Sequence, residues 1–228
     1  MNATVIKGTL REQLTYQGVL MVDVTIDYPV MTGGAYEGGR REFNRHYVRQ
    51  ARALVRHARL NLLPEAIAQY RDALANGFPF HPYALVQTFE VTYHAGVLIS
   101  LFLDEYEYTG GAHGNTIREG NTWDLRRRRM LKLHDLFRQG YDYREPILQV
   151  VAHEAHRRQT SGEVDYFEGL DENLLEYFDE DNYYLTYGGL AVFYPLYTIG
   201  PYAIGIQVFV VPYGVFGSNL VYPLFSLA

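Results

Sequence analysis

Cysteine is absent from this sequence of 228 residues, and tryptophan occurs only once. The missing thiols exclude disulfide bridges, thiolate zinc sites and cysteine nucleophiles, but they leave the redox compartment open. Lysine is scarce as well, because 18 of the 20 basic residues are arginine. What is present, with 48% hydrophobic and 20% charged residues, is the composition of an ordinary globular protein.

Charged residues and histidine are missing from the last 47 positions, 182–228. We expect this stretch to be mostly buried. Prolines and glycines such as Pro195, Pro201 and Gly205 interrupt it too often for an apolar helix of about 20 residues, so we expect no transmembrane segment. The N-terminus lacks the basic, apolar, small-residue order of a signal peptide, and any signal or anchor is expected to lie outside these residues.

The aromatic residues are mostly 21 Tyr and 12 Phe, which favour pleated, half-buried sheets. We predict an α+β fold with antiparallel sheets and two main helices packed on one face. One compact unit, 1–228, is expected to contain an N-terminal hairpin and helix lobe, 1–78, and a larger sheet-rich lobe, 79–228.

Hydrophobic periodicity predicts the individual elements. The expected strands are 4–10 and 19–28, joined by a turn at Gln17 and Gly18, then 83–93, 97–108, 116–125, 183–186, 190–193 and 204–211. A short strand and turn is expected at 131–137. The expected helices are 43–62, which Pro64 ends or kinks, then 64–75 and 143–158, with a helical turn near 171–177.

Known catalytic patterns are not found. His153 and His156 are three residues apart, whereas a metalloprotease helix needs four, so exposed helix histidines are the better interpretation. None of the four serines lies in a Gly-x-Ser-x-Gly elbow, and no glycine-rich phosphate loop is present. We expect no catalytic residue, no metal site and no cofactor.

The acidic cluster and the arginine clusters each have a functional and a structural interpretation. Nine carboxylates between Glu163 and Asp181 could hold Ca²⁺ or act in glycosidic chemistry, but a solvated face is favoured because they lack the EF-hand order. Arginines at 40–71 and 126–129 could contact phosphates, yet the net charge is −6. We therefore expect a solvated helix face, a solvated hairpin turn and no nucleic acid partner.

A glycine-rich segment at 108–115, Tyr-Thr-Gly-Gly-Ala-His-Gly-Asn, stands out between two predicted strands. Its glycines allow positive φ angles and frame one imidazole. We take Tyr108, Gly110, Gly111, His113 and Asn115 as the candidate ligand-binding residues. Alternatively, His113 only bonds to backbone and pins the loop, or it acts with Glu105 or Glu107 in an unrecognised hydrolase.

This segment, followed by Trp123-Asp124-Leu125 and 131–137, resembles a bacterial family. The chain is similar to the extracytoplasmic domain of lysozyme-sensing anti-sigma-V factors (RsiV-like), also found as the non-catalytic region of PdaC-type peptidoglycan deacetylases. Further matching pieces are 28–30, 97–101, 182–186, 197–203 and 211–213. Thr198 and Gln207 stand where the family commonly carries glutamates.

The resemblance implies an extracytoplasmic recognition module of the cell envelope, not an enzyme, with lysozyme or another muramidase as partner. A second hypothesis is binding of cell-wall glycan, in which exposed tyrosine rings stack against sugars. The tyrosines considered for it are Tyr106, Tyr108, Tyr183, Tyr187 and Tyr197. The platform exists only if these side chains lie outside the core.

Overall fold

A computed structural model describes residues 3–224 of the chain. The contacts divide it into two compact units. The first contains the chain up to residue 90 together with 103–117 and 125–128, and the second contains 91–102, 118–124 and the chain from residue 129 onward. Helices and strands occur in both units, which confirms the predicted α+β class.

The first unit opens with the predicted hairpin of β1 (Thr4–Tyr16) and β2 (Val19–Thr32), whose strands are longer than expected. Gln17 and Gly18 form the two-residue turn, and both have positive φ, 50° and 79°. Two positive φ angles are the signature of a type I′ turn, whose twist matches that of the flanking strands. The turn sets the pairing of Tyr16 with Val19, and an irregularity between Leu14 and Thr15 then shifts the register before the buried Val22, Val24 and Ile26.

The predicted long helix is interrupted without being ended. α1 (Glu37–His57) runs into a π-helical turn, η1 (Ala58–Leu62), and then into α2 (Leu63–Asn76). Pro64 cannot donate a backbone hydrogen bond, which would interrupt an α-helix at this point. The wider π-helical turn before Pro64 accommodates the missing hydrogen bond, and the α-helix continues after it. Gly77, with φ 69°, caps α2 in the left-handed conformation.

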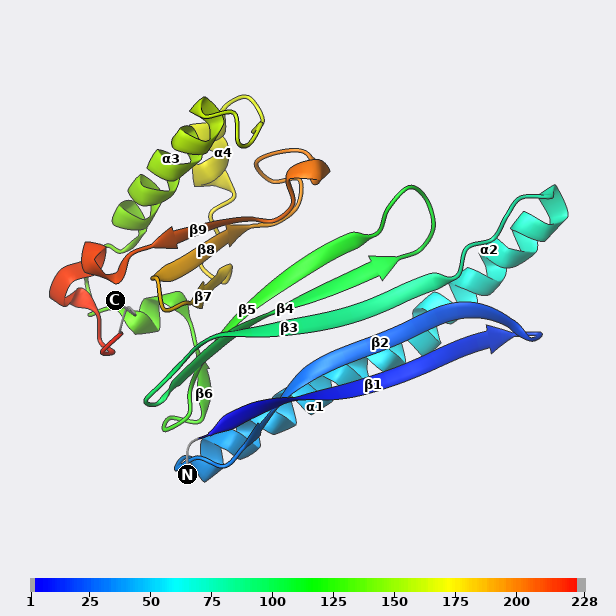
Figure 1. The fold of residues 1–228 in the computed structure, drawn as a ribbon, viewed down its shortest axis with the longest axis horizontal. Coiled ribbons are helices and arrows are strands. Elements are labelled where there is room, and N and C mark those ends of the chain that lie inside the picture. Colours follow the sequence, from blue (N-terminus) through cyan, green and yellow to red (C-terminus); the bar gives the residue numbers. More distant parts are fainter. Residues whose placement is uncertain (1–2, 225–228) are drawn as a thin grey trace. The chain divides into compact units, whose positions relative to one another are not determined.

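A parallel strand pair corrects the expectation of purely antiparallel sheets. β3 (Tyr83–Ala95) pairs with β2 in parallel, Val22 opposite Tyr83. A parallel pair needs a crossover connection, and α1 and α2 supply it while packing on β2 (Figure 1). Strands β4 (Leu98–Tyr108), β5 (Asn115–Asp124) and β6 (Arg129–Leu131) follow in order to complete a six-stranded sheet.

The expected lobe boundary after residue 78 does not coincide with the two units. β3, β4 and β5 each contribute residues to both units, and the 108–115 segment belongs to the first unit instead of the C-terminal lobe. These strands contain 13, 11 and 10 residues. At about 3.3 Å per residue they are roughly 33–43 Å long, so their two ends lie in different packing environments.

The second unit has a sheet of its own. Antiparallel strands β7 (Tyr183–Leu185), β8 (Leu190–Tyr194) and β9 (Gln207–Val211) form a separate three-stranded sheet. α3 (Arg144–Thr160) buries Ile147, Val151 and Ala155 and packs on β9. The two main helices thus pack on two different sheets. Shorter helices are η2 (Leu133–Leu136), α4 (Leu170–Glu176), η3 (Tyr202–Ile204) and η4 (Tyr213–Asn219).

A buried serine links three strands of the second unit. Ser100 Oγ is fully buried, accepts a hydrogen bond from Leu185 N at 2.8 Å and lies 3.2 Å from the carbonyl oxygen of Asn121. The uncharged stretch supplies much of the surrounding core, including Val192, Phe209 and Val211, as expected. Within residues 3–224, no helix is long and apolar enough to cross a membrane.

Candidate site at the glycine loop and the end of α2

The glycine-rich segment connects β4 to β5, and two of its three glycines have the predicted positive φ. Gly110 and Gly111 have φ of 103° and 85°, a region that disfavours side chains. The Tyr108 hydroxyl donates a hydrogen bond to the Gly111 carbonyl at 3.1 Å, which closes the turn. Three of the five predicted site residues therefore shape the loop itself.

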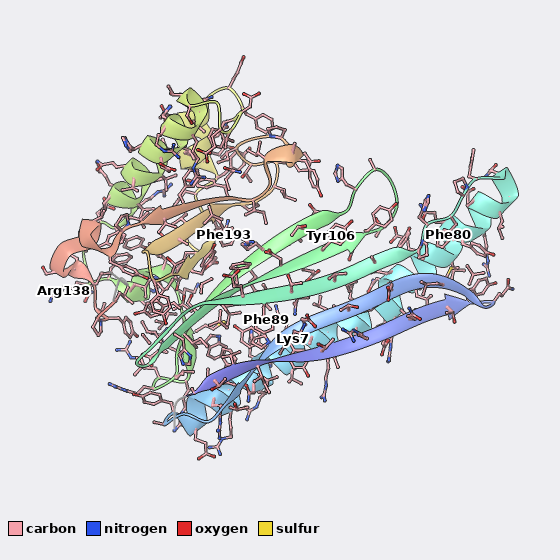
Figure 2. The ribbon with its side chains drawn as sticks, viewed as in Figure 1. Lys7, Phe80, Phe89, Tyr106, Arg138 and Phe193 are labelled. Carbon is pink, nitrogen blue, oxygen red and sulfur yellow. The ribbon has the colours of Figure 1, made fainter. Side chains whose placement is uncertain are left out.

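Gly114 is required for a different reason, because its backbone lies against neighbouring atoms. A Cβ at Gly114 would lie 2.5 Å from the Glu107 carbonyl oxygen and 2.6 Å from the Tyr106 ring. Both distances are shorter than Cβ contacts allow, so only glycine fits without rearrangement. Tyr106, near the end of β4, thereby supports the returning chain (Figure 2).

His113 is exposed, and its Nδ1 atom lies 2.9 Å from the carbonyl oxygen of Gly114. This contact agrees with the structural alternative, in which the imidazole bonds to backbone. Of the two carboxylates considered for a hydrolase, Glu107 lies 2.9 Å from His57 Nε2. Asn115 is exposed at the start of β5.

A pocket of about 210 Å³ lies between the loop and the end of α2. Gly110 and Gly111 form one wall, and a Cβ at Gly110 would come within 2.8 Å of Gln69 Nε2. The other lining residues are Gln69, Asp72, Ala73, Phe78, Pro79, Phe80 and His81. The sequence analysis found the loop but missed its partner, the end of α2.

Exposed apolar side chains occur at the end of α2 and directly after it, and one of them, Phe78, lines this pocket. Phe78 is 67% exposed and Leu74 is 64% exposed. Phe80, in contrast, packs edge-on against Tyr70 with ring centroids 5.3 Å apart. The signal in the sequence was the Phe-Pro-Phe triplet directly after the Gly77 cap, since a helix stop places such residues at the surface. We call the pocket, Leu74, Phe78 and the 108–115 segment the loop site.

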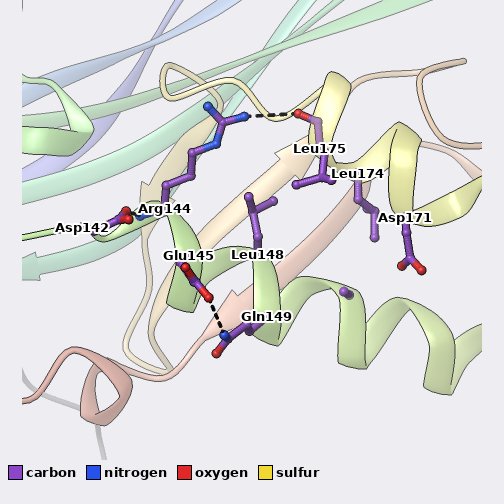
Figure 3. Close-up of a pocket in the computed structure, with 9 residues that line it drawn as sticks. Asp142, Arg144, Glu145, Leu148, Gln149, Asp171, Leu174 and Leu175 are labelled. Carbon is purple, nitrogen blue, oxygen red and sulfur yellow. Dashed lines mark hydrogen bonds between the residues drawn. The ribbon is translucent and has the colours of Figure 1, made fainter.

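A second pocket, of about 450 Å³, lies between α3 and α4 in the second unit (Figure 3). Leu148, Leu174 and Leu175 supply apolar walls, and Arg144 donates a hydrogen bond to the Leu175 carbonyl at 3.3 Å. Carboxylates of Asp142, Glu145 and Asp171 lie at its lining. No pattern in the sequence indicated this pocket, because α3 and α4 are separated by an irregular acidic segment.

Comparisons with known proteins match two different family models to two parts of the chain. The family model described as deacetylase PdaC matches residues 20–116, and the model described as a protein of unknown function, DUF3298, matches 134–214. We call residues 20–116 the PdaC segment and residues 134–214 the DUF3298 segment, after the models that they match. The whole loop site lies in the PdaC segment, and the α3 and α4 pocket lies in the DUF3298 segment. The predicted resemblance to PdaC-type proteins is thus confirmed.

One curated relative is the peptidoglycan-N-acetylmuramic acid deacetylase PdaC of Bacillus subtilis, 25% identical over 71 residues. The match covers 31% of this chain and only 15% of that protein. The fold is similar to a DUF3298 family member from Bacteroides fragilis, with a TM-score of 0.72 and 19% identity over 96% of this chain and 94% of that one. A second, from Pseudomonas aeruginosa, has a TM-score of 0.60 and 21% identity over 99% and 98%.

The two helix histidines of the DUF3298 segment lie at the surface, and several of its acids have charged or polar partners. His153 and His156 are exposed, and His156 Nε2 lies 2.7 Å from Asp171 Oδ1. Hydrogen bonds from Arg157 and Arg158 lower the pKa of Glu154 to about 2. Among residues 3–224, no group of three or more His, Asp or Glu is arranged to hold a metal ion.

The tyrosines considered for sugar binding do not form one platform. Tyr183 is buried and donates to the Leu131 carbonyl at 2.7 Å, and Tyr187 donates to the His94 carbonyl at 3.0 Å. Tyr197, in contrast, is 54% exposed, and its ring lies 5.7 Å from that of Tyr202. Tyr197 also has a φ of 65°, an uncommon conformation for a side chain of this size.

The two positions that depart from the family's glutamates have structural partners. Gln207 is buried, accepts a hydrogen bond from the Tyr166 hydroxyl at 3.1 Å and donates to the Ile204 carbonyl at 2.6 Å. Thr198 donates to the Pro195 carbonyl at 2.7 Å. Neutral side chains suit both positions, because each bonds to neutral groups.

Proposed function

We propose that this chain is a non-catalytic recognition module of the bacterial cell envelope that binds a protein such as lysozyme or another muramidase through the loop site. The observation that carries the proposal is the exposed Phe78 beside a pocket walled by Gly110 and Gly111. An exposed aromatic next to a hollow can act as an anchor while the partner fills the hollow.

The energetics favour a partner that covers this surface. Burying a Phe side chain completely contributes roughly 1.5–3 kcal/mol, and Phe78 and Leu74 are mostly exposed. The loop beside them is held by the Tyr108 hydroxyl and by the close fit of Gly114, so little of its conformational freedom remains to be lost on binding. A rigid loop next to apolar anchors suits a protein surface.

The envelope location and the muramidase partner rest on the family resemblance. PdaC of Bacillus subtilis is named for action on N-acetylmuramic acid of peptidoglycan. Muramidases act on the same polymer, so a module placed beside it would meet them. The location of the chain outside the cytoplasm is part of this proposal.

The test is a calorimetric titration of the purified chain with lysozyme, compared among three variants. Phe78→Ser should weaken binding at least tenfold, which corresponds to about 1.4 kcal/mol. His113→Ala should weaken it less, because the imidazole bonds to its own loop. Leu175→Ser is the matched control, since Leu175 is also exposed, 54%, but lies in the other unit. Equal affinities for Phe78→Ser and the control would refute the loop site.

Glycan binding is the second candidate, supported by Tyr197. Its exposed ring beside Tyr202 and its unusual backbone conformation are features of a stacking surface for a sugar. Titration with soluble peptidoglycan fragments separates the two candidates. Binding of the fragments that is lost in Tyr197→Ala, with no lysozyme binding, would favour the glycan.

A further inference from the structure

Five arginines form a continuous stripe on α1 and its π-helical extension. Arg45, Arg49, Arg52, Arg56 and Arg59 follow one another at intervals of four, three, four and three residues, which places them on one helix face. All five are exposed. Fourteen residues separate the first from the last, so at about 1.5 Å per residue the stripe is roughly 20 Å long, with neighbouring Cβ atoms about 5–6 Å apart. We call this set the arginine stripe.

Only the two ends of the arginine stripe are neutralised. Arg45 pairs with Glu42 at 3.0 Å, and Arg59 pairs with Glu12 of β1. Within residues 3–224, no ion pair or hydrogen bond involves the guanidinium groups of Arg49, Arg52 and Arg56. Like charges at this spacing destabilise a helix, so three unpaired arginines in a row are not explained by the stability of α1.

The stripe borders a groove. Arg52, Arg56 and Arg59 line a hollow of about 490 Å³ between α1 and β1, where Glu12 is the one carboxylate in the lining. The other lining residues are Arg11 of β1 and the aliphatic Leu10, Val55 and Leu60. Because Glu12 is bound to Arg59, no other carboxylate in the lining opposes the cations of Arg11, Arg52 and Arg56.

We propose that the arginine stripe and its groove bind a linear polyanion with repeating phosphate groups. A row of guanidinium groups at 5–6 Å intervals matches a chain with many charges better than a single anion, and Arg suits phosphate because of its fork of donors. The lining of the groove contains no aromatic side chain on which a base could stack. The site therefore selects a phosphate polymer without bases over a nucleic acid.

The experiment measures binding of inorganic polyphosphate as a function of salt concentration. The plot of log K against log salt has a slope that reports the number of phosphate contacts. Arg52→Gln with Arg56→Gln should weaken binding and reduce the magnitude of this slope by about two. Arg127→Gln with Arg138→Gln is the matched control, since it removes the same charge from exposed positions elsewhere and should leave the slope unchanged.

The outcomes separate the possible explanations. An equal loss in both double variants would overturn the site and indicate an effect of net charge. Absence of saturable polyphosphate binding, or tighter binding of single-stranded oligothymidylate than of polyphosphate, would also overturn it. Orthophosphate should bind far more weakly than the polymer, because it engages one position of the stripe. Thermal unfolding of Arg52→Gln with Arg56→Gln should show an unchanged or raised Tm, since a like-charge pair is removed.

Discussion

At the scale of single residues, Gly114 holds the glycine loop by its lack of a side chain. Gly114→Ala would place a Cβ against the Glu107 carbonyl and the Tyr106 ring, and we expect a loss of about 1–3 kcal/mol in the free energy of unfolding. Gly214→Ala, with no atom within 4 Å of the added Cβ, should change it by less than about 0.5 kcal/mol. Urea unfolding of the two variants measures the difference, and similar values would show that the loop adapts.

Asp135 should give the protein a defined sensitivity to acid. Arg129 donates two hydrogen bonds to this carboxylate at 2.8 Å, and they lower the pKa of Asp135 to about 2. A lowered pKa in the folded state stabilises the protein above the ordinary carboxyl pKa, and this contribution is lost as the pH falls from about 4 to 2. Asp135→Asn should therefore reduce the free energy of unfolding at pH 7 but not at pH 2.

The control for Asp135 is the exposed carboxylate Asp181 in the same unit. Asp181→Asn should leave the slope of stability between pH 4 and pH 2 close to that of the unchanged protein, whereas Asp135→Asn should flatten it. Guanidinium unfolding at a series of pH values provides both curves. If the two variants have parallel curves, the pair with Arg129 does not affect acid stability.

At the scale of elements, the β1 and β2 hairpin depends on its two-residue turn. Gln17 adopts a φ of 50°, which asparagine tolerates better than glutamine. Gln17→Asn should raise the free energy of unfolding by about 0.5 kcal/mol, and the same change at Gln13, in the middle of exposed β1, should not. Thermal melting of both variants tests this prediction. A higher melting temperature for Gln13→Asn as well would indicate a general effect of residue type and not an effect of the turn.

Hydrophobic periodicity predicted the helices and strands well, but it did not predict which strands pair with each other. The hairpin, α1, α3 and most strands follow from which residues recur on one face, and that is a local property. The parallel pairing of β2 with β3 joins residues far apart in sequence. The pairs within β7, β8 and β9 are local, but periodicity does not say whether these strands join the first sheet or form their own. The π-helical turn escaped prediction because Pro64 indicates a disruption without specifying its form.

The loop site too was only partly predictable from local sequence patterns. Gly110 and Gly111 were recognisable because positive φ angles need glycine, and the structure confirms both angles. Phe78 was missed, since a single apolar residue after a helix gives no periodic signal. The exposure of Phe78 and its position near the loop depend on the folded structure, in which the end of α2 lies next to the connection between β4 and β5.

At the scale of the whole molecule, the chain has two segments that match family models and two compact units. The PdaC segment contains the loop site and the arginine stripe, and the DUF3298 segment contains the α3 and α4 pocket and the Tyr197 ring. Protein recognition and polyanion binding are thus assigned to different surfaces of one segment. Variants at Phe78 and at Arg52 should for this reason affect lysozyme and polyphosphate separately.

Amide hydrogen exchange of the chain with and without saturating lysozyme tests the central claim most directly. We predict slower exchange in residues 69–81 and 108–115, with no change in α3, α4 or the connection around Tyr197. Binding that leaves the exchange of these two segments unchanged, or that protects the second unit instead, would contradict protein recognition through the loop site.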